Sequence, residues 1–164
     1  MINSRILKYH RTFHSCIGKK LFHPCTKTHF KHWTFLLSTI RSKDEEREMN
    51  WLYAFDDGLR KARVDNKVML LYFCAEWCGW CRKLVQETYD NQNVVLFLNE
   101  QFVCLKVDID QNLTLAENYQ NHIVPTTVFI SSNRIELGRI EGYIPPDQFL
   151  EYTKGILTKY SSIN

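Results

Sequence analysis

The stretch Trp77-Cys78-Gly79-Trp80-Cys81 places two cysteines three residues apart, where an apolar run over 68–73 meets an amphipathic segment that begins at Arg82. The run predicts a strand and the segment predicts a helix. A helix N-terminus presents unpaired N–H groups and a partial positive charge, which favour a thiolate over a thiol. The spacing lets the second sulfur reach back to the first. Such a dithiol can attack a disulfide, hold the mixed disulfide and release it by internal attack.

The segments around this stretch predict alternating helices and strands. Helical spacing of apolar residues predicts a helix over 50–64, and continuous apolarity over 68–74 is typical of a central strand covered on both faces. The other predicted elements are two helical pieces broken near 91–93, a strand over 102–109, a helix over 113–119, strands over 126–130 and 135–140, and a helix opened by Pro145-Pro146-Asp147. This order predicts an α/β fold, with a central β-sheet flanked by helices on both faces.

Charge divides the chain into two parts. Residues 1–43 hold nine Lys and Arg and no Asp or Glu, whereas residues 44–164 hold twelve Lys and Arg against eighteen Asp and Glu. We therefore expect a basic, disordered leader over 1–43 and a folded domain over 44–164. Three interpretations of the leader stay open: a disordered tail, an organelle-type presequence, or upstream sequence with the true start near Met49. A charge run is usually solvated, so we expect no nucleic-acid partner.

Composition and cysteine placement bound the class of protein. The hydrophobic content of 45% and charged content of 24% are typical of a soluble globular protein. The sequence has no run of about twenty apolar residues, so it predicts no membrane-spanning helix. Six cysteines do not make a disulfide scaffold in a chain of 164 residues, and Cys74 and Cys104 lie within apolar runs, as buried free thiols do. This mildly favours a cytoplasmic location and leaves exported, periplasmic and organellar locations open.

Three motifs carry a resemblance to a known family: Ala75 to Cys81, Lys106-Val107-Asp108-Ile109-Asp110-Gln111-Asn112, and Val124-Pro125-Thr126. In their order and spacing, over residues 50–160, the chain resembles the thioredoxin-like superfamily. It is most similar to the C-terminal domain of bacterial transmembrane thiol:disulfide interchange proteins, on the stretches 66–68, 87–94 and Gly142-Tyr143. The resemblance implies a thioredoxin fold with a mixed four-stranded sheet. It also implies a monomeric thiol–disulfide oxidoreductase that acts on protein disulfides as a reductase, draws on an upstream thiol reductant, and needs no cofactor or metal.

The motifs assign expected roles to individual residues. Cys78 is the expected nucleophile, partly exposed at the helix start, and Cys81 the residue that resolves the mixed disulfide. The resemblance implies a cis peptide bond before Pro125 and a backbone pairing of Val124 with the substrate polypeptide. The expected substrate-binding residues are Trp77, Gly79, Trp80, Val124, Pro125 and Thr126.

Two positions depart from the thioredoxin pattern. Thioredoxins bury an aspartate in the strand before the motif, where this chain has Tyr72, and they have a proline between the cysteines, where this chain has Trp80. The proton acceptor for Cys81 is therefore open. Glu76 and Lys106 are candidates for tuning the site.

Other functions fit parts of the pattern. The cysteines could form half of a structural zinc site, but the rest of the predicted domain offers no pair of ligands at zinc spacing. A binding module or chaperone on the same fold would not need its cysteines. A peroxide- or thiol-reactive sensor would be oxidised without any protein substrate.

Overall fold

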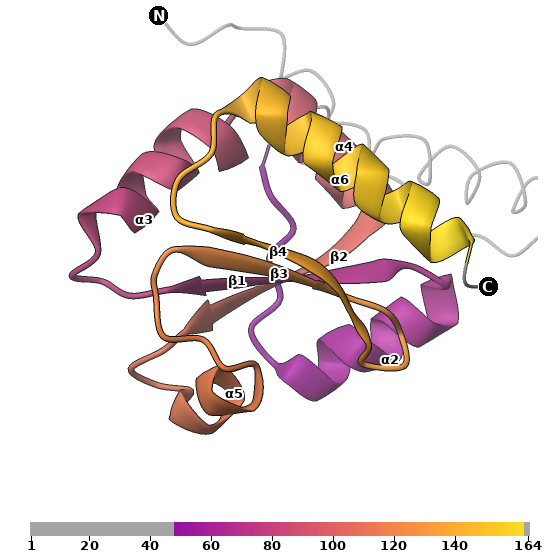
Figure 1. Ribbon diagram of the computed structural model, residues 1–164, viewed down its shortest axis with the longest axis horizontal. Helices are drawn as coiled ribbons and strands as arrows, with labels where there is room; N and C mark the ends of the chain where they lie inside the picture. Colours follow the sequence, from indigo (N-terminus) through magenta and orange to yellow (C-terminus); the bar gives the residue numbers. More distant parts are fainter. Residues whose placement is uncertain (1–47, 163–164) are drawn as a thin grey trace, which may run out of the picture. The chain divides into compact units, whose positions relative to one another are not determined.

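The computed structural model describes residues 48–162, so the predicted leader over 1–43 lies outside the described residues. The strand that precedes the two cysteines, β1 (Val68–Cys74), is buried along its whole length. It occupies an inner position in a four-stranded sheet of order β2-β1-β3-β4 (Figure 1). The other strands are β2 (Phe102–Asp108), β3 (Thr126–Ile130) and β4 (Glu136–Glu141).

Strand direction makes the sheet mixed. β2 runs parallel to β1, whereas β3 is antiparallel to β1 and β4 is antiparallel to β3. The register pairs Phe73 with Thr126 and Cys74 with Asp108. The start of β3 and the end of β2 therefore lie beside the end of β1, from which the two-cysteine motif continues.

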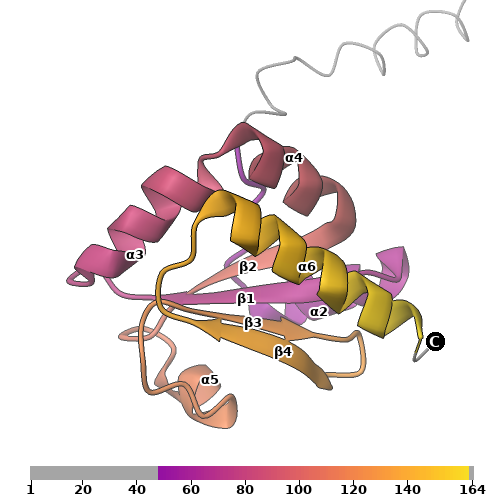
Figure 2. The same ribbon diagram turned by 45° about the horizontal axis from the view of Figure 1, so that its top comes forward.

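Helices cover both faces of the sheet, as Figures 1 and 2 show. Side chains alternate along a strand, so Tyr72 and Cys74 pack on one face of β1 and Leu71 and Phe73 on the other. The helices are α2 (Phe55–Asp65), α3 (Gly79–Leu84), α4 (Gln92–Gln101), α5 (Leu113–Asn118) and α6 (Pro146–Ser161), with a π-helical turn, η1 (Val85–Tyr89), after α3. Residues of α3, α4 and α6 share one buried cluster with the first face, and residues of α2 and α5 share another with the second. The predicted fold class is confirmed.

The first helix begins later than its spacing predicts. The helix predicted over 50–64 begins at Phe55, because the chain before it is extended along the edge of β2. The Leu52 N–H donates to the Cys104 carbonyl at 2.9 Å, and the Lys106 N–H donates to the Leu52 carbonyl at 2.9 Å. Edge pairing satisfies these backbone groups, so tertiary structure overrides the helical spacing.

The remaining elements follow the predicted pattern, with ends shifted by a residue or two. The predicted break near 91–93 is confirmed, because the Asn91 side chain caps α4 by accepting the N–H groups of Asn93 and Val94. Gly142 ends β4 with φ +85°, and Pro146 opens α6. Among residues 48–162, no helix combines the length and apolarity needed to cross a bilayer.

Candidate active site

Cys78 and Cys81 are joined by a disulfide at the N-terminus of α3. Cys78 is the N-cap residue, and its sulfur accepts the Cys81 N–H at 3.0 Å. Once the disulfide is reduced, this N–H and the partial positive charge of the helix end stabilise a thiolate on Cys78. The local sequence therefore builds a redox-capable pair on one rigid turn.

Both cysteines are less accessible than expected. Cys78 is only 5% exposed and Cys81 4%, so the prediction of a partly exposed Cys78 is wrong for this disulfide-bonded form. Both residues belong to the buried cluster beneath α3. The exposed residues of the motif are its two tryptophans, Trp77 at 66% and Trp80 at 61%, whereas Gly79 occupies the first position of α3.

Each tryptophan is held by its own partners. The Trp77 indole N–H donates to the Asp110 carboxylate at 2.9 Å. Trp80 lies beside the Tyr143 ring, with centroids 6.1 Å apart, and the Lys83 ammonium lies over both rings, 5.2 Å and 4.6 Å from the centroids. Cation–π contacts of this kind restrain aromatic rings on a surface. Two large, exposed aromatic side chains thus flank the disulfide.

Tyr143 is itself anchored from the helix side of the site. Its hydroxyl donates to the Glu87 carboxylate at 2.5 Å, and this hydrogen bond raises the pKa of the phenol. No motif in the sequence pointed to this contact between Tyr143 and Glu87. Its only signal was that Glu87 and Tyr143 both lie in stretches that carry the family resemblance.

The loop before β3 lies at the same end of the sheet. The Val124–Pro125 peptide bond is cis, as the resemblance implies. Thr126 begins β3 opposite Phe73, and the Pro125 carbonyl accepts the Gly142 N–H at 2.7 Å. Val124 is half-buried and packs against both core clusters. The predicted residues Val124, Pro125 and Thr126 thus lie at the sheet edge from which the motif emerges.

The floor beneath Cys81 is formed by Tyr72 and its neighbours. The Tyr72 hydroxyl donates to the Cys81 carbonyl at 3.1 Å. Burial raises the pKa of this phenol well above its ordinary value, and the nearby Cys74 raises it further. Lys106 is the β2 partner of Tyr72, and an open pocket of about 680 Å³ is lined by both residues, Cys81 and Glu76. Among the described residues, Lys106 and Glu76 form no ion pair with each other.

We expect Tyr72→Phe to leave the pH dependence of disulfide reduction unchanged. The raised pKa keeps the phenol protonated through the neutral range, so it cannot accept the proton of Cys81. The lost hydrogen bond to the Cys81 carbonyl should cost about 1 kcal/mol of the free energy of unfolding. The rate measured from about pH 6 to about pH 9, beside a denaturation curve, checks both effects. A profile displaced by about one pH unit would instead show that Tyr72 takes part in the proton transfer.

The other cysteines of the described residues are free. Cys74 and Cys104 are both buried, and burial raises the pKa of each thiol. A protonated, buried thiol is a poor nucleophile, which agrees with the expectation that both are core residues. Within residues 48–162, no three His, Cys, Asp or Glu side chains gather as a metal site requires.

The chain matches a protein-family model and superposes on solved structures. The family model Thioredox_DsbH, described as a protein of unknown function, DUF255, matches residues 34–135. The solved structure of a thioredoxin from Thermus thermophilus superposes with a TM-score of 0.64 at 25% identity, covering 71% of this chain and 92% of that one. A structure titled DsbH Oxidoreductase superposes with a TM-score of 0.62 at 20% identity, covering 68% and 85%, a likeness that shows the fold alone.

Curated sequences give the same superfamily over shorter spans. Thioredoxin-1 of Drosophila melanogaster is 33% identical over 71 residues, which are 43% of this chain and 64% of that protein. Two other relatives, an uncharacterized protein of Caenorhabditis elegans and spermatogenesis-associated protein 20 of Mus musculus, are much longer. The match covers 14% and 10% of their lengths. The chain thus spans less than two thirds of each of these three relatives. The resemblance to the thioredoxin-like superfamily predicted from the sequence is confirmed.

Proposed function

Because the chain belongs to the Thioredox_DsbH family, whose function is undescribed, we propose its activity from the site itself: it is a thiol–disulfide oxidoreductase that reduces disulfides in protein substrates. The observation that carries the proposal is the disulfide between Cys78 and Cys81 at the start of α3. The relatives named thioredoxin support the same chemistry.

The proposed reaction transfers two electrons from the reduced pair to a substrate disulfide. The Cys78 thiolate attacks one substrate sulfur, so a mixed disulfide forms and the other substrate sulfur leaves as a thiolate that takes up a proton. Cys81 then loses its proton and attacks the Cys78 sulfur. The Cys78–Cys81 bond forms, the bond to the substrate breaks, and the second substrate sulfur leaves as a thiol. An upstream thiol reductant restores the pair by the reverse exchange.

Several surface features support a polypeptide substrate. The exposed rings of Trp77 and Trp80 offer apolar contact area beside the disulfide. The loop at Val124 lies at the same end of the sheet, where we propose that its backbone pairs with an extended substrate segment. Electrons pass from thiol to thiol, so the proposed enzyme needs no metal or cofactor. We propose that it works as a monomer. We propose that Glu76 and Lys106 tune its potential.

The equilibrium potential of the Cys78–Cys81 couple tests the direction of electron flow. We expect a value of about −270 mV, that of a general reductant, when the full chain is equilibrated with dithiothreitol or glutathione mixtures and the thiols are trapped and counted. A value of about −120 mV would instead make the protein an oxidant. If mass mapping of the oxidised protein shows that these two sulfurs never join to each other, the proposed activity is wrong.

A further inference from the structure

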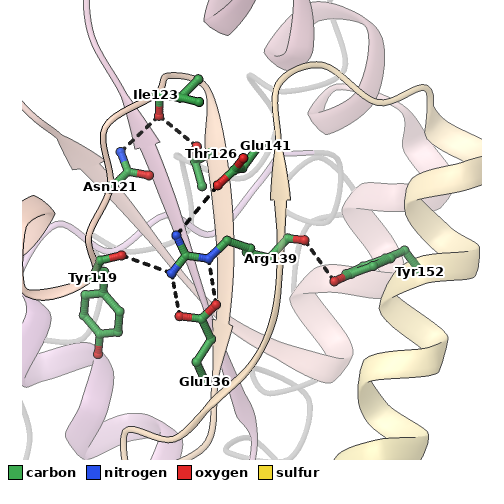
Figure 3. Close-up of polar contacts among 8 residues, drawn as sticks. All are labelled: Tyr119, Asn121, Ile123, Thr126, Glu136, Arg139, Glu141 and Tyr152. Atoms are coloured by element: carbon green, nitrogen blue, oxygen red, sulfur yellow. Dashed lines mark hydrogen bonds and ion pairs between the residues drawn. The ribbon is translucent and has the colours of Figure 1, made fainter.

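The loop that precedes β3 is held by side-chain hydrogen bonds to one carbonyl. The Ile123 carbonyl accepts the Asn121 side-chain amide at 3.1 Å and the Thr126 hydroxyl at 2.8 Å (Figure 3). The Pro125 carbonyl, two residues further along the chain, accepts the Gly142 N–H. Val124 lies between these two fixed carbonyls, so the position of its backbone depends on the loop as a whole.

The other end of this loop is the C-terminus of α5. Gln120 has a left-handed backbone with φ 49°, and its N–H donates to the Glu117 carbonyl at 2.9 Å. The Asn121 N–H donates to the Ala116 carbonyl at 2.8 Å. These two bonds form a Schellman motif, which fixes the direction in which the chain leaves the helix. The end of α5 therefore sets where the loop starts.

Arg139 on β4 reaches across to that helix end. One of its terminal nitrogens donates to the Tyr119 carbonyl at 3.0 Å, a group at the helix end that lacks the partner of a helix interior (Figure 3). The guanidinium also donates twice to the Glu136 carboxylate, at 2.7 Å each, and lies 3.9 Å from that of Glu141. Arg139 pairs with Val128, whose side chain lies in the cluster beneath α2 and α5, which puts the arginine on the α5 face.

The two carboxylates and the backbone hold the guanidinium in one orientation. The Arg139 carbonyl accepts the Tyr152 hydroxyl of α6 at 2.9 Å, so the strand is fixed from the opposite face as well. The side chain is 27% exposed. An ion pair this open contributes little stability by itself. The rigid fork of an arginine, however, can bind a carboxylate through two parallel hydrogen bonds and donate to a carbonyl at the same time, whereas a lysine is a point charge without this fixed geometry.

We infer that Arg139 is a positioning residue for substrate binding: held by Glu136, it fixes the Tyr119 carbonyl and thereby the loop that presents Val124 to a polypeptide substrate. The inference rests on the proposed function. A disulfide without a polypeptide chain has no backbone to pair with Val124. The contribution of Arg139 should therefore depend on the size of the substrate.

The test compares two substrates with four forms of the full chain: wild type, Arg139→Ala, Arg139→Lys and Arg63→Ala. Reduction of insulin is followed with dithiothreitol as electron donor. Reduction of dithiobis-nitrobenzoate is followed over a single turnover of the reduced chain after dithiothreitol has been removed, because dithiothreitol reduces this small disulfide directly. Arg63 is the matched control, because this exposed arginine also donates to a backbone carbonyl, that of Ser132 at 3.1 Å, in the turn between β3 and β4. We expect both Arg139 variants to raise the KM for insulin about tenfold with kcat unchanged.

The small disulfide should be reduced by all four forms at the wild-type rate, and Arg63→Ala should match wild type on insulin. Equal losses on both substrates, or no loss on insulin, would overturn the inference. If Arg139→Ala fails to fold, Arg139→Lys decides, since it keeps the charge beside Glu136 and lacks the second arm. In that variant the Asn121 amide should exchange its hydrogen faster than in wild type. A wild-type chain inactive on both substrates removes the proposed function, and this inference with it.

Discussion

Replacing Cys78 by serine should abolish the reduction of insulin disulfides, with a loss of about a thousandfold or more in rate. A serine hydroxyl is not ionised near neutral pH and cannot form a mixed disulfide, so the first bond of the proposed reaction never forms. The protein should still fold. Serine is a preferred N-cap residue, and its oxygen can accept the Cys81 N–H that the sulfur accepts at 3.0 Å.

The measurement is the turnover of insulin by the full chain with dithiothreitol, beside a denaturation curve for each variant. Cys104→Ala serves as the control for losing a cysteine as such, because Cys104 is buried in β2 and does not line the pocket beside Cys81. It should keep its activity and lose about 1 kcal/mol of stability at most. If Cys78→Ser keeps more than about a tenth of the wild-type rate, the nucleophile lies elsewhere.

The inner strands of the sheet were predictable because they differ strongly from their surroundings in hydrophobicity. β1 is apolar at nearly every position and is buried at every position, and the short strand β3 begins and ends at the predicted residues. The helix before β1 was less predictable. Trp51 and Leu52 fit a helical face with Phe55, but Leu52 pairs with the backbone of β2. Edge pairing depends on a partner far along the chain, which local spacing does not report.

Within the candidate site, the motifs located the cysteines and the loop at Pro125 but not the contacts that hold them. The partner of the Trp80 ring comes from beyond β4, and the partner of the Tyr119 carbonyl comes from β4 itself. Both depend on the order of strands in the sheet. The low exposure of Cys78 was also missed, because the helical position of a residue does not report how neighbouring elements cover it. Sequence identifies reactive groups more readily than it identifies the residues that position them.

Replacing Cys81 by serine should convert the proposed enzyme into a trap that stays covalently bound to its substrates. The N–H that stabilises the Cys78 thiolate belongs to the backbone of residue 81, so it remains after the substitution and the first attack proceeds. The second attack is lost. An internal thiol acts at a far higher effective concentration than a thiol in solution, so release by an external thiol should be at least about a hundredfold slower.

The trapped species is measured by non-reducing electrophoresis and mass spectrometry after Cys81→Ser is incubated in reduced form with oxidised insulin. We expect an adduct joined through Cys78 that dithiothreitol cleaves. The double variant Cys78→Ser, Cys81→Ser should not form it. This double variant also separates the enzyme from a binding module. A module should bind unfolded chains with undiminished affinity when both cysteines are absent, whereas the proposed reaction depends on a covalent bond that the double variant cannot make. Trp77 and Trp80 are exposed and are not changed by these substitutions. A loss of capture in the double variant would therefore show that the substrate is held by the sulfur rather than by the rings.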